Sequence, residues 1–104
     1  MERRDPTPDS AGTEVQRFDR DDQAYLQWVA TNPDGFVLDL PRGDTSALLL
    51  HRAGCQRLAE EGDAGGWTAG SLKLASGEKW RLDDWAEGER GERPPRCPVC
   101  RPDD

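Results

Sequence analysis

Apolar side chains are scarce in this chain of 104 residues, of which 34% are hydrophobic and 7% aromatic, while a further 34% are charged. Apolar burial alone leaves so short a chain near the margin of stability, so we expect an additional structural staple. The sequence contains no apolar run close to the roughly 20 residues that cross a bilayer, and its start, Met-Glu-Arg-Arg, lacks an apolar signal segment. We therefore expect a small domain in a cytoplasm of the bacterial type, with no membrane partner.

Basic residues are also in deficit, because 14 Lys and Arg face 21 Asp and Glu and give a formal net charge of -7. This balance opposes indiscriminate attraction to phosphate backbones and anionic membranes. A local basic face remains compatible with it.

The composition divides the chain into two parts. Residues 1–16 combine Pro, Asp, Arg, Ser, Thr and Gly with almost nothing to bury, which predicts a disordered tail. Residues 17–104 are predicted to form a single zinc-binding domain of the α+β class. Its expected parts are an N-terminal helix, a short antiparallel sheet and a C-terminal helix followed by a zinc knuckle.

The first half of the domain predicts a helix and then a hairpin. The helix begins at Asp21, carries Tyr25, Trp28 and Val29 at helical spacing, and ends at Asn32-Pro33. The apolar runs 36–40 and 47–50 are separated by turn residues and predict two paired strands. One or two helical turns are expected over 56–61.

The second half predicts a third strand over 67–74 and a last helix. Ser76 is the expected cap of this helix, Leu82, Trp85 and Ala86 share its buried face, and Gly88 is the expected stop. Residues 88–95 then form an extended linker to the C-terminal cysteines. Asp83 and Asp84 are predicted to lie on a solvated face.

The single histidine and all three cysteines fall into two short clusters, His51-x-x-x-Cys55 and Cys97-x-x-Cys100. A reducing compartment disfavours disulfides, and Cys-x-x-Cys bends two thiolates onto one cation. Four protein ligands close a tetrahedron, which predicts one structural Zn²⁺ without an open position. Two alternatives are unliganded side chains and a redox pair at Cys97 and Cys100, although no helix-starting pattern follows Cys100.

The residues from His51 to Pro102 resemble the metal-binding domain of the Ada DNA-repair family. The similarity lies in His51-Arg52-Ala53-Gly54-Cys55 and in Cys97-Pro98-Val99-Cys100-Arg101-Pro102. The chain is most similar to variants with a His-Arg-x-x-Cys element that are appended to bacterial nucleases. The resemblance implies zinc ligation and a role beside DNA.

This chain departs from the repair proteins at the methyl-accepting position, where it carries His51 instead of a cysteine. Zinc ligation therefore transfers from the resemblance, whereas methyl transfer does not. The sequence favours a non-catalytic zinc module that assists recognition of DNA or another nucleic acid. The alternatives are a protein-protein interaction adaptor and, ranked last, a repair enzyme with a thiol methyl acceptor.

Arginines surround the predicted ligands and allow two interpretations. Three thiolates on Zn²⁺ leave the centre with a net charge of about -1, which nearby guanidinium groups can balance. Alternatively, the arginines form a basic face that meets phosphates. The residues assigned to this nucleic-acid face are Arg52, Arg57, Arg96 and Arg101.

Tryptophan is the other residue type with a candidate role. Most of the four tryptophans are expected in the core, but Trp80 lies off the buried face of the last helix and can anchor a protein partner.

Overall fold

The computed structural model describes residues 15–43, 48–60 and 66–103. Within these ranges the chain forms four strands and three helices, in an α+β arrangement. The strands are β1 (Gln16–Phe18), β2 (Phe36–Pro41), β3 (Leu49–Arg52) and β4 (Ser71–Ser76). The helices are α2 (Asp22–Thr31), α3 (Gln56–Glu60) and α4 (Lys79–Arg90).

The strands form one antiparallel sheet in the order β1-β4-β2-β3. The predicted hairpin is confirmed, since β2 pairs with β3 and sets Val37 opposite His51. Strand β2 also pairs with β4 over its whole length, from Phe36 opposite Ser76 to Pro41 opposite Ser71. The sheet therefore has β2 and β4 at its centre and β3, which carries His51, at one edge.

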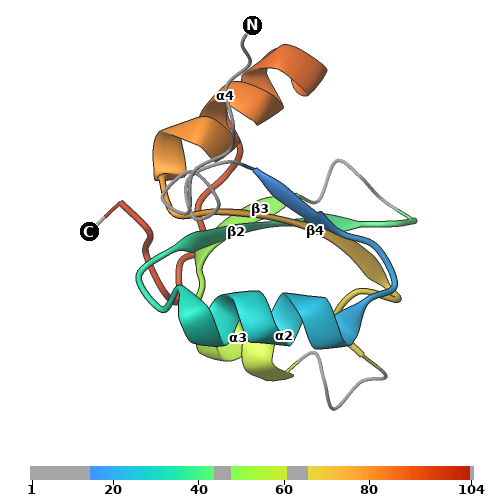
Figure 1. The fold of residues 1–104 in the computed structure, drawn as a ribbon. Coiled ribbons are helices and arrows are strands. Elements are labelled where there is room, and N and C mark those ends of the chain that lie inside the picture. Colours follow the sequence, from blue (N-terminus) through green and yellow to red (C-terminus); the bar gives the residue numbers. More distant parts are fainter. Residues whose placement is uncertain (1–14, 44–47, 61–65, 104) are drawn as a thin grey trace, which may run out of the picture.

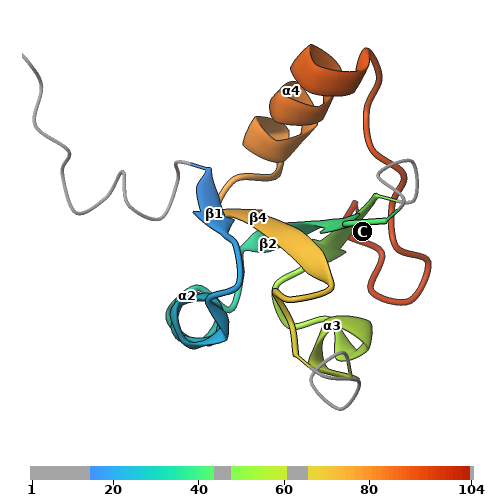
Figure 2. The same ribbon diagram turned by 90° about the vertical axis from the view of Figure 1, so that its right-hand side faces the viewer.

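Helices cover both faces of this sheet, with α2 and α3 on one side and α4 on the other (Figures 1 and 2). Because successive strand residues point to opposite faces, the sheet supplies two separate apolar clusters. The α2 side contains Tyr25, Trp28, Val37, Ala53, Cys55, Leu58, Ala75 and Cys97. The α4 side contains Leu38, Leu40, Leu48, Leu50, Leu74, Leu82 and Ala86.

The N-terminal helix matches its prediction closely. Asp21 is the N-cap, and its side chain accepts a hydrogen bond from the amide of Ala24 at 3.2 Å. The helix ends at Thr31, directly before Asn32-Pro33. The chain then turns through Gly35, where an added Cβ would lie 2.6 Å from Cη2 of Trp28, so glycine permits this close approach.

Three other boundaries differ from the predictions. The third strand begins at Ser71 and not at Trp67, because Thr68 instead hydrogen-bonds Asp22 through its amide (2.7 Å) and its hydroxyl (2.6 Å). Ser76 lies in β4 and is not the cap of α4, whose N-cap is Glu78. The predicted stop at Gly88 is wrong, since α4 continues to Arg90 and ends at Gly91, which has a φ of 85°.

Strand β1 was absent from the sequence-based prediction, and it pairs with β4 from Gln16 opposite Ala75 to Phe18 opposite Lys73. Residues 1–14 of the predicted 1–16 tail lie outside the described residues, as do Ala47 and Glu61. The predicted end of the tail at residue 16 is wrong, because Gln16 is the first residue of β1. None of the described helices is long and apolar enough to span a membrane.

Candidate metal centre

The first two candidate ligands come from the end of β3 and the turn that follows it. His51 is the last but one residue of β3. A tight turn comes next, in which the amide of Cys55 donates to the carbonyl of Arg52 at 3.0 Å. The carbonyl of Cys55 in turn accepts hydrogen bonds from Leu58 and Ala59, at 3.1 and 3.2 Å. Cys55 is therefore held at the start of α3 and close to His51.

The second pair of ligands reaches the same place because residues 95–97 run along the free edge of β3. Leu50 donates its amide to the carbonyl of Pro95 and accepts from the amide of Cys97, both at 2.9 Å. A turn then returns the chain, with the amide of Arg101 donating to the carbonyl of Cys97 at 3.0 Å. These bonds place Cys97 beside Leu50. Because His51 directly follows Leu50 in the sequence, Cys97 also lies close to His51.

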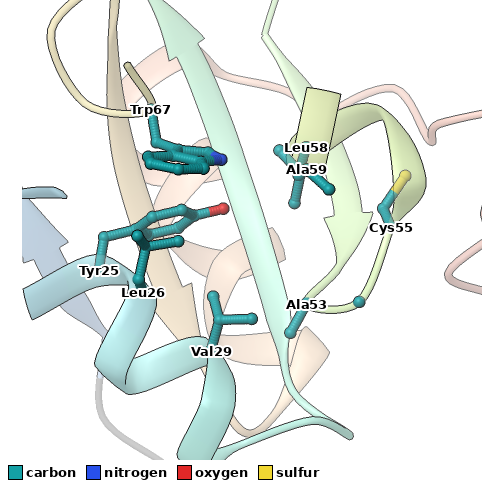
Figure 3. A pocket seen from close by; sticks show the side chains of 9 residues that line it. Tyr25, Leu26, Val29, Ala53, Cys55, Leu58, Ala59 and Trp67 are labelled. Atoms are coloured by element: carbon teal, nitrogen blue, oxygen red, sulfur yellow. The ribbon is translucent and has the colours of Figure 1, made fainter. Parts of the chain in front are cut away.

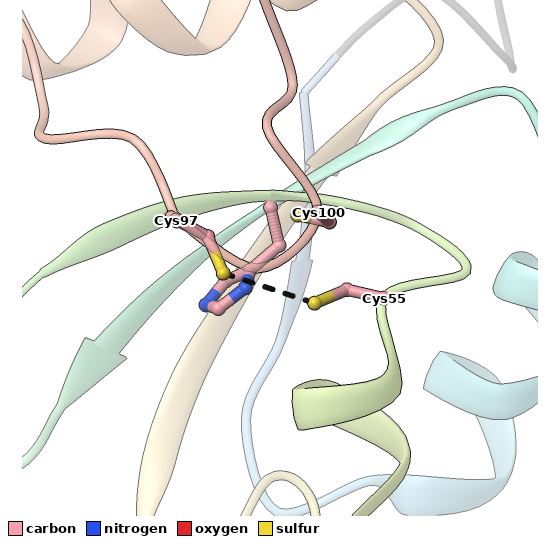
Figure 4. A group of neighbouring side chains, drawn as sticks. Cys55, Cys97 and Cys100 are labelled. Atoms are coloured by element: carbon pink, nitrogen blue, oxygen red, sulfur yellow. Dashed lines mark hydrogen bonds between the residues drawn. The ribbon is translucent and has the colours of Figure 1, made fainter.

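The four predicted ligands converge as a result. One donor atom from each of His51, Cys55, Cys97 and Cys100 lies within 4.8 Å of the others. The sulfur atoms of Cys55 and Cys97 are 3.9 Å apart (Figure 4). Two sulfurs on one tetrahedral Zn²⁺, each about 2.3 Å from the metal, are separated by about 3.8 Å. The cluster can therefore hold one metal ion.

Burial prepares His51 for ligation. Its side chain is buried, and desolvation lowers its pKa from 6.5 to about 4 despite the attraction of Asp39, so the imidazole is neutral at pH 7. Its buried Nδ1 atom has no hydrogen-bond partner among the residues that the structure describes. A buried polar atom without a partner is costly in a folded protein, and a neutral imidazole is the form that binds metal. Both observations fit a metal ligand.

The three cysteines are free thiols. Burial, together with the neighbouring Cys55 and Cys97, raises the pKa of Cys100 to about 12 even though the amide of Arg52 hydrogen-bonds its sulfur at 3.2 Å. Burial also opposes ionisation of Cys97, but hydrogen bonds from the amides of Cys100 and Val99 outweigh it and lower the pKa of that thiol. If all three ionise at this spacing, a cation is needed to balance their charge, as in a metal centre.

The four arginines assigned to a nucleic-acid face have different surroundings. Arg52 donates from Nε to the carbonyl of Cys100 at 2.9 Å and from a terminal nitrogen to the carbonyl of Arg101 at 3.0 Å. Arg96 is held by two carboxylates, those of Asp83 and Asp103. Arg57 and Arg101 are exposed. The guanidinium groups of Arg52 and Arg96 therefore serve contacts within the protein.

Asp83 is a correction to the sequence-based prediction, since it is only 7% exposed and does not lie on a solvated face. It follows the buried Leu82 and precedes the buried Ala86 by three positions, so it borders the apolar stripe of α4. Asp84, in contrast, is exposed as predicted. The predicted position of Trp80 off the buried face is confirmed, with 52% of its surface exposed and the guanidinium of Arg81 at 4.6 Å from its ring centre.

An apolar pocket of about 190 Å³ adjoins the candidate metal centre. Figure 3 shows that Tyr25, Leu26 and Val29 from α2 face Leu58 and Ala59 from α3 across it. Ala53, Gly54 and Cys55 connect the pocket wall to the metal cluster, and Trp67 completes the lining. The sequence-based prediction missed this pocket, although Leu26 beside Tyr25 and Val29 already extends the apolar face of the helix.

In comparisons with known proteins, no protein-family model, no curated protein and no solved structure matches the chain. The interpretation of the buried cluster of one histidine and three cysteines as a possible metal site consequently depends on its own geometry.

Proposed function

We propose that this protein is a non-catalytic module organised around one structural Zn²⁺ ion held by His51, Cys55, Cys97 and Cys100. The observation that carries the proposal is the convergence of these four donors within 4.8 Å at a largely buried position. Soft thiolates and a neutral imidazole are ligands that suit zinc, and four protein ligands complete its tetrahedron. A centre filled in this way has no position for an activated water molecule, which argues against hydrolytic chemistry.

The resemblance to the Ada metal-binding domain supports the same zinc assignment, but repair by methyl transfer is not proposed. The position that corresponds to the acceptor cysteine is His51, and a zinc-bound imidazole is a poor nucleophile. Incubation with DNA that carries labelled methylphosphotriesters tests this point. Label on any of the three cysteines would make the protein an enzyme.

For the partner we propose a protein that inserts an apolar side chain into the pocket between α2 and α3. The volume of about 190 Å³ suits one large apolar side chain, and Leu26 at the pocket is 39% exposed. Buried apolar anchors in such pockets supply most of the binding energy of protein interfaces. Cys55 belongs to both the pocket and the metal cluster, so the metal would also hold one pocket wall in place.

DNA remains the second candidate partner. The resemblance to the Ada domain favours DNA, and Arg57 and Arg101 are exposed on the surface. Its support is reduced because Arg52 and Arg96 are engaged inside the protein by carbonyl and carboxylate oxygens. The net charge of -7 further weakens the attraction of phosphates.

Selection from a displayed peptide library, run beside titrations with duplex DNA, single-stranded DNA and RNA at low salt, separates the two candidates. We expect selected peptides to share an apolar anchor and to lose binding to the Leu26→Asp variant. Gln27→Asp is the matched control, because it places the same charge on the next exposed position of α2. Binding of nucleic acid that weakens on replacing Arg57 and Arg101 by Gln, with no selected peptide, would reverse the ranking.

A further inference from the structure

The buried carboxylate of Asp83 on α4 is paired with two guanidinium groups, those of Arg93 and Arg96. It accepts hydrogen bonds from both terminal nitrogens of Arg96, at 2.6 and 2.8 Å, and from Arg93 at 3.2 Å. A bidentate pair of this kind fixes the orientation of the guanidinium as well as its position. Removal of one partner from a buried pair is costly, so Asp83 and Arg96 stabilise each other's position.

Arg96 directly precedes the first cysteine of the Cys-x-x-Cys pair. Its backbone is part of the 95–97 segment that is hydrogen-bonded to Leu50 of β3, while its side chain reaches α4 on the other side. The segment that leads into Cys97 is therefore anchored at two points. One is the edge strand that carries His51, and the other is Asp83.

The chain that leaves the cysteine pair returns to the same set of charges. Asp103 accepts from Nε of Arg96 at 2.9 Å and from Nζ of Lys79 at 2.5 Å. Lys79 is the first residue of α4. Ion pairs with α4 consequently hold the Cys97–Cys100 turn on both sides, at Arg96 before it and at Asp103 after it.

We propose that Asp83 is a positioning residue for the metal centre, which raises metal affinity through Arg96 without touching the ion. This inference rests on the proposed zinc site. Its physical basis is preorganisation. Because α4 holds two of the four ligands near their bound positions, metal binding loses less free energy to the ordering of the chain. Groups that hydrogen-bond a metal ligand change metal affinity by about 10-fold to 100-fold when they are replaced, and Asp83 acts one contact further out, so the lower end of this range applies.

The test compares Asp83→Asn with Asp84→Asn, which removes the same charge from the next residue of α4, at an exposed site. Each protein is titrated with Co²⁺, and the bound Co²⁺ is then displaced by Zn²⁺ in competition with a chromophoric chelator. We expect Asp83→Asn to weaken Zn²⁺ binding by about 10-fold. Asp84→Asn should change it by no more than about twofold.

Amide hydrogen exchange on the zinc-loaded proteins distinguishes positioning from general stability. Asp83→Asn should speed exchange at the amide of Cys97, which is hydrogen-bonded to β3, and at the amide of Arg101, which is hydrogen-bonded across the turn. The central strands β2 and β4 should keep their protection. A purely structural role would speed exchange in β2 and β4 as well, and that result would overturn the proposal. So would an unchanged Zn²⁺ affinity in a folded Asp83→Asn protein.

Asp103→Asn provides the same test if Asp83→Asn does not fold. Asp103 is exposed, and its replacement removes the carboxylate that Arg96 and Lys79 share. We expect weaker Zn²⁺ binding and faster amide hydrogen exchange at Arg101. The proposal would be overturned if Zn²⁺ affinity and exchange both stayed unchanged. Failure of the unsubstituted protein to bind Co²⁺ or Zn²⁺ is a different outcome, which refutes the metal site itself.

Discussion

The buried ion pair between Lys73 and Asp39 leads to a sharp prediction about stability. Lys73 on β4 is completely buried, and its Nζ atom lies 2.5 Å from a carboxylate oxygen of Asp39, the residue directly opposite on β2. The pair faces α2, on the side of the sheet that carries His51. Replacement of Lys73 by Met keeps most of the side-chain volume but leaves Asp39 without its cation.

Breaking a buried pair in this way costs about 3–5 kcal/mol. The side chain of Asp39 retains 12% exposure, so water can offset part of the loss and we expect about 3 kcal/mol. For a domain of this size, that loss lowers the melting temperature by about 10–25 °C. The double variant Lys73→Met/Asp39→Leu removes both charges and should recover most of the lost stability.

Urea unfolding of the zinc-loaded proteins, followed by tryptophan fluorescence and circular dichroism, measures these differences. The dependence of the unfolding free energy on urea should keep the same slope, because the same surface is exposed in each case. A loss below about 1 kcal/mol for Lys73→Met would refute the reasoning. So would a double variant that is as unstable as the sum of its two single variants.

Two further predictions concern the ligand set and the end of α4. His51→Ala should lose tight zinc binding, whereas His51→Cys should retain it, because four cysteines also form a structural zinc site. Zinc content after dialysis measures both variants. Equal zinc content in the two variants would show that His51 is not a ligand. Gly91→Ala should destabilise the protein by about 1 kcal/mol because Gly91 has a positive φ. Gly88→Ala, inside α4 with open space around it, should stabilise it by about 0.5–1 kcal/mol. Thermal unfolding compares these two variants, and the opposite order would place the helix end at Gly88.

Local patterns in the sequence were sufficient to predict the elements with strong signals. Asp21 at the start of α2, Asn32-Pro33 at its end, and the apolar runs of the hairpin each have a short-range physical cause. The metal cluster was predictable for the same reason, since the only histidine and every cysteine lie at ligand spacing.

Features that depend on distant partners were not predictable in this way. Strand β1 contains one large apolar residue, Phe18, and forms because β4 offers it an edge. Thr68 leaves the predicted strand because Asp22, far away in sequence, accepts its hydrogen bonds. Asp83 looks like a surface residue until the fold brings Arg96 to it. Each of these depends on tertiary contacts that override local propensity.

Native mass spectrometry of the purified protein, combined with thermal unfolding before and after chelation, tests the central claim most directly. We expect one Zn²⁺ per chain and loss of the cooperative unfolding transition on chelation, because the four ligands join β3, the start of α3 and the 97–100 turn into one core. Cys97→Ser should be as damaging as chelation. A metal-free protein whose thermal unfolding is unchanged by a chelator would contradict the account.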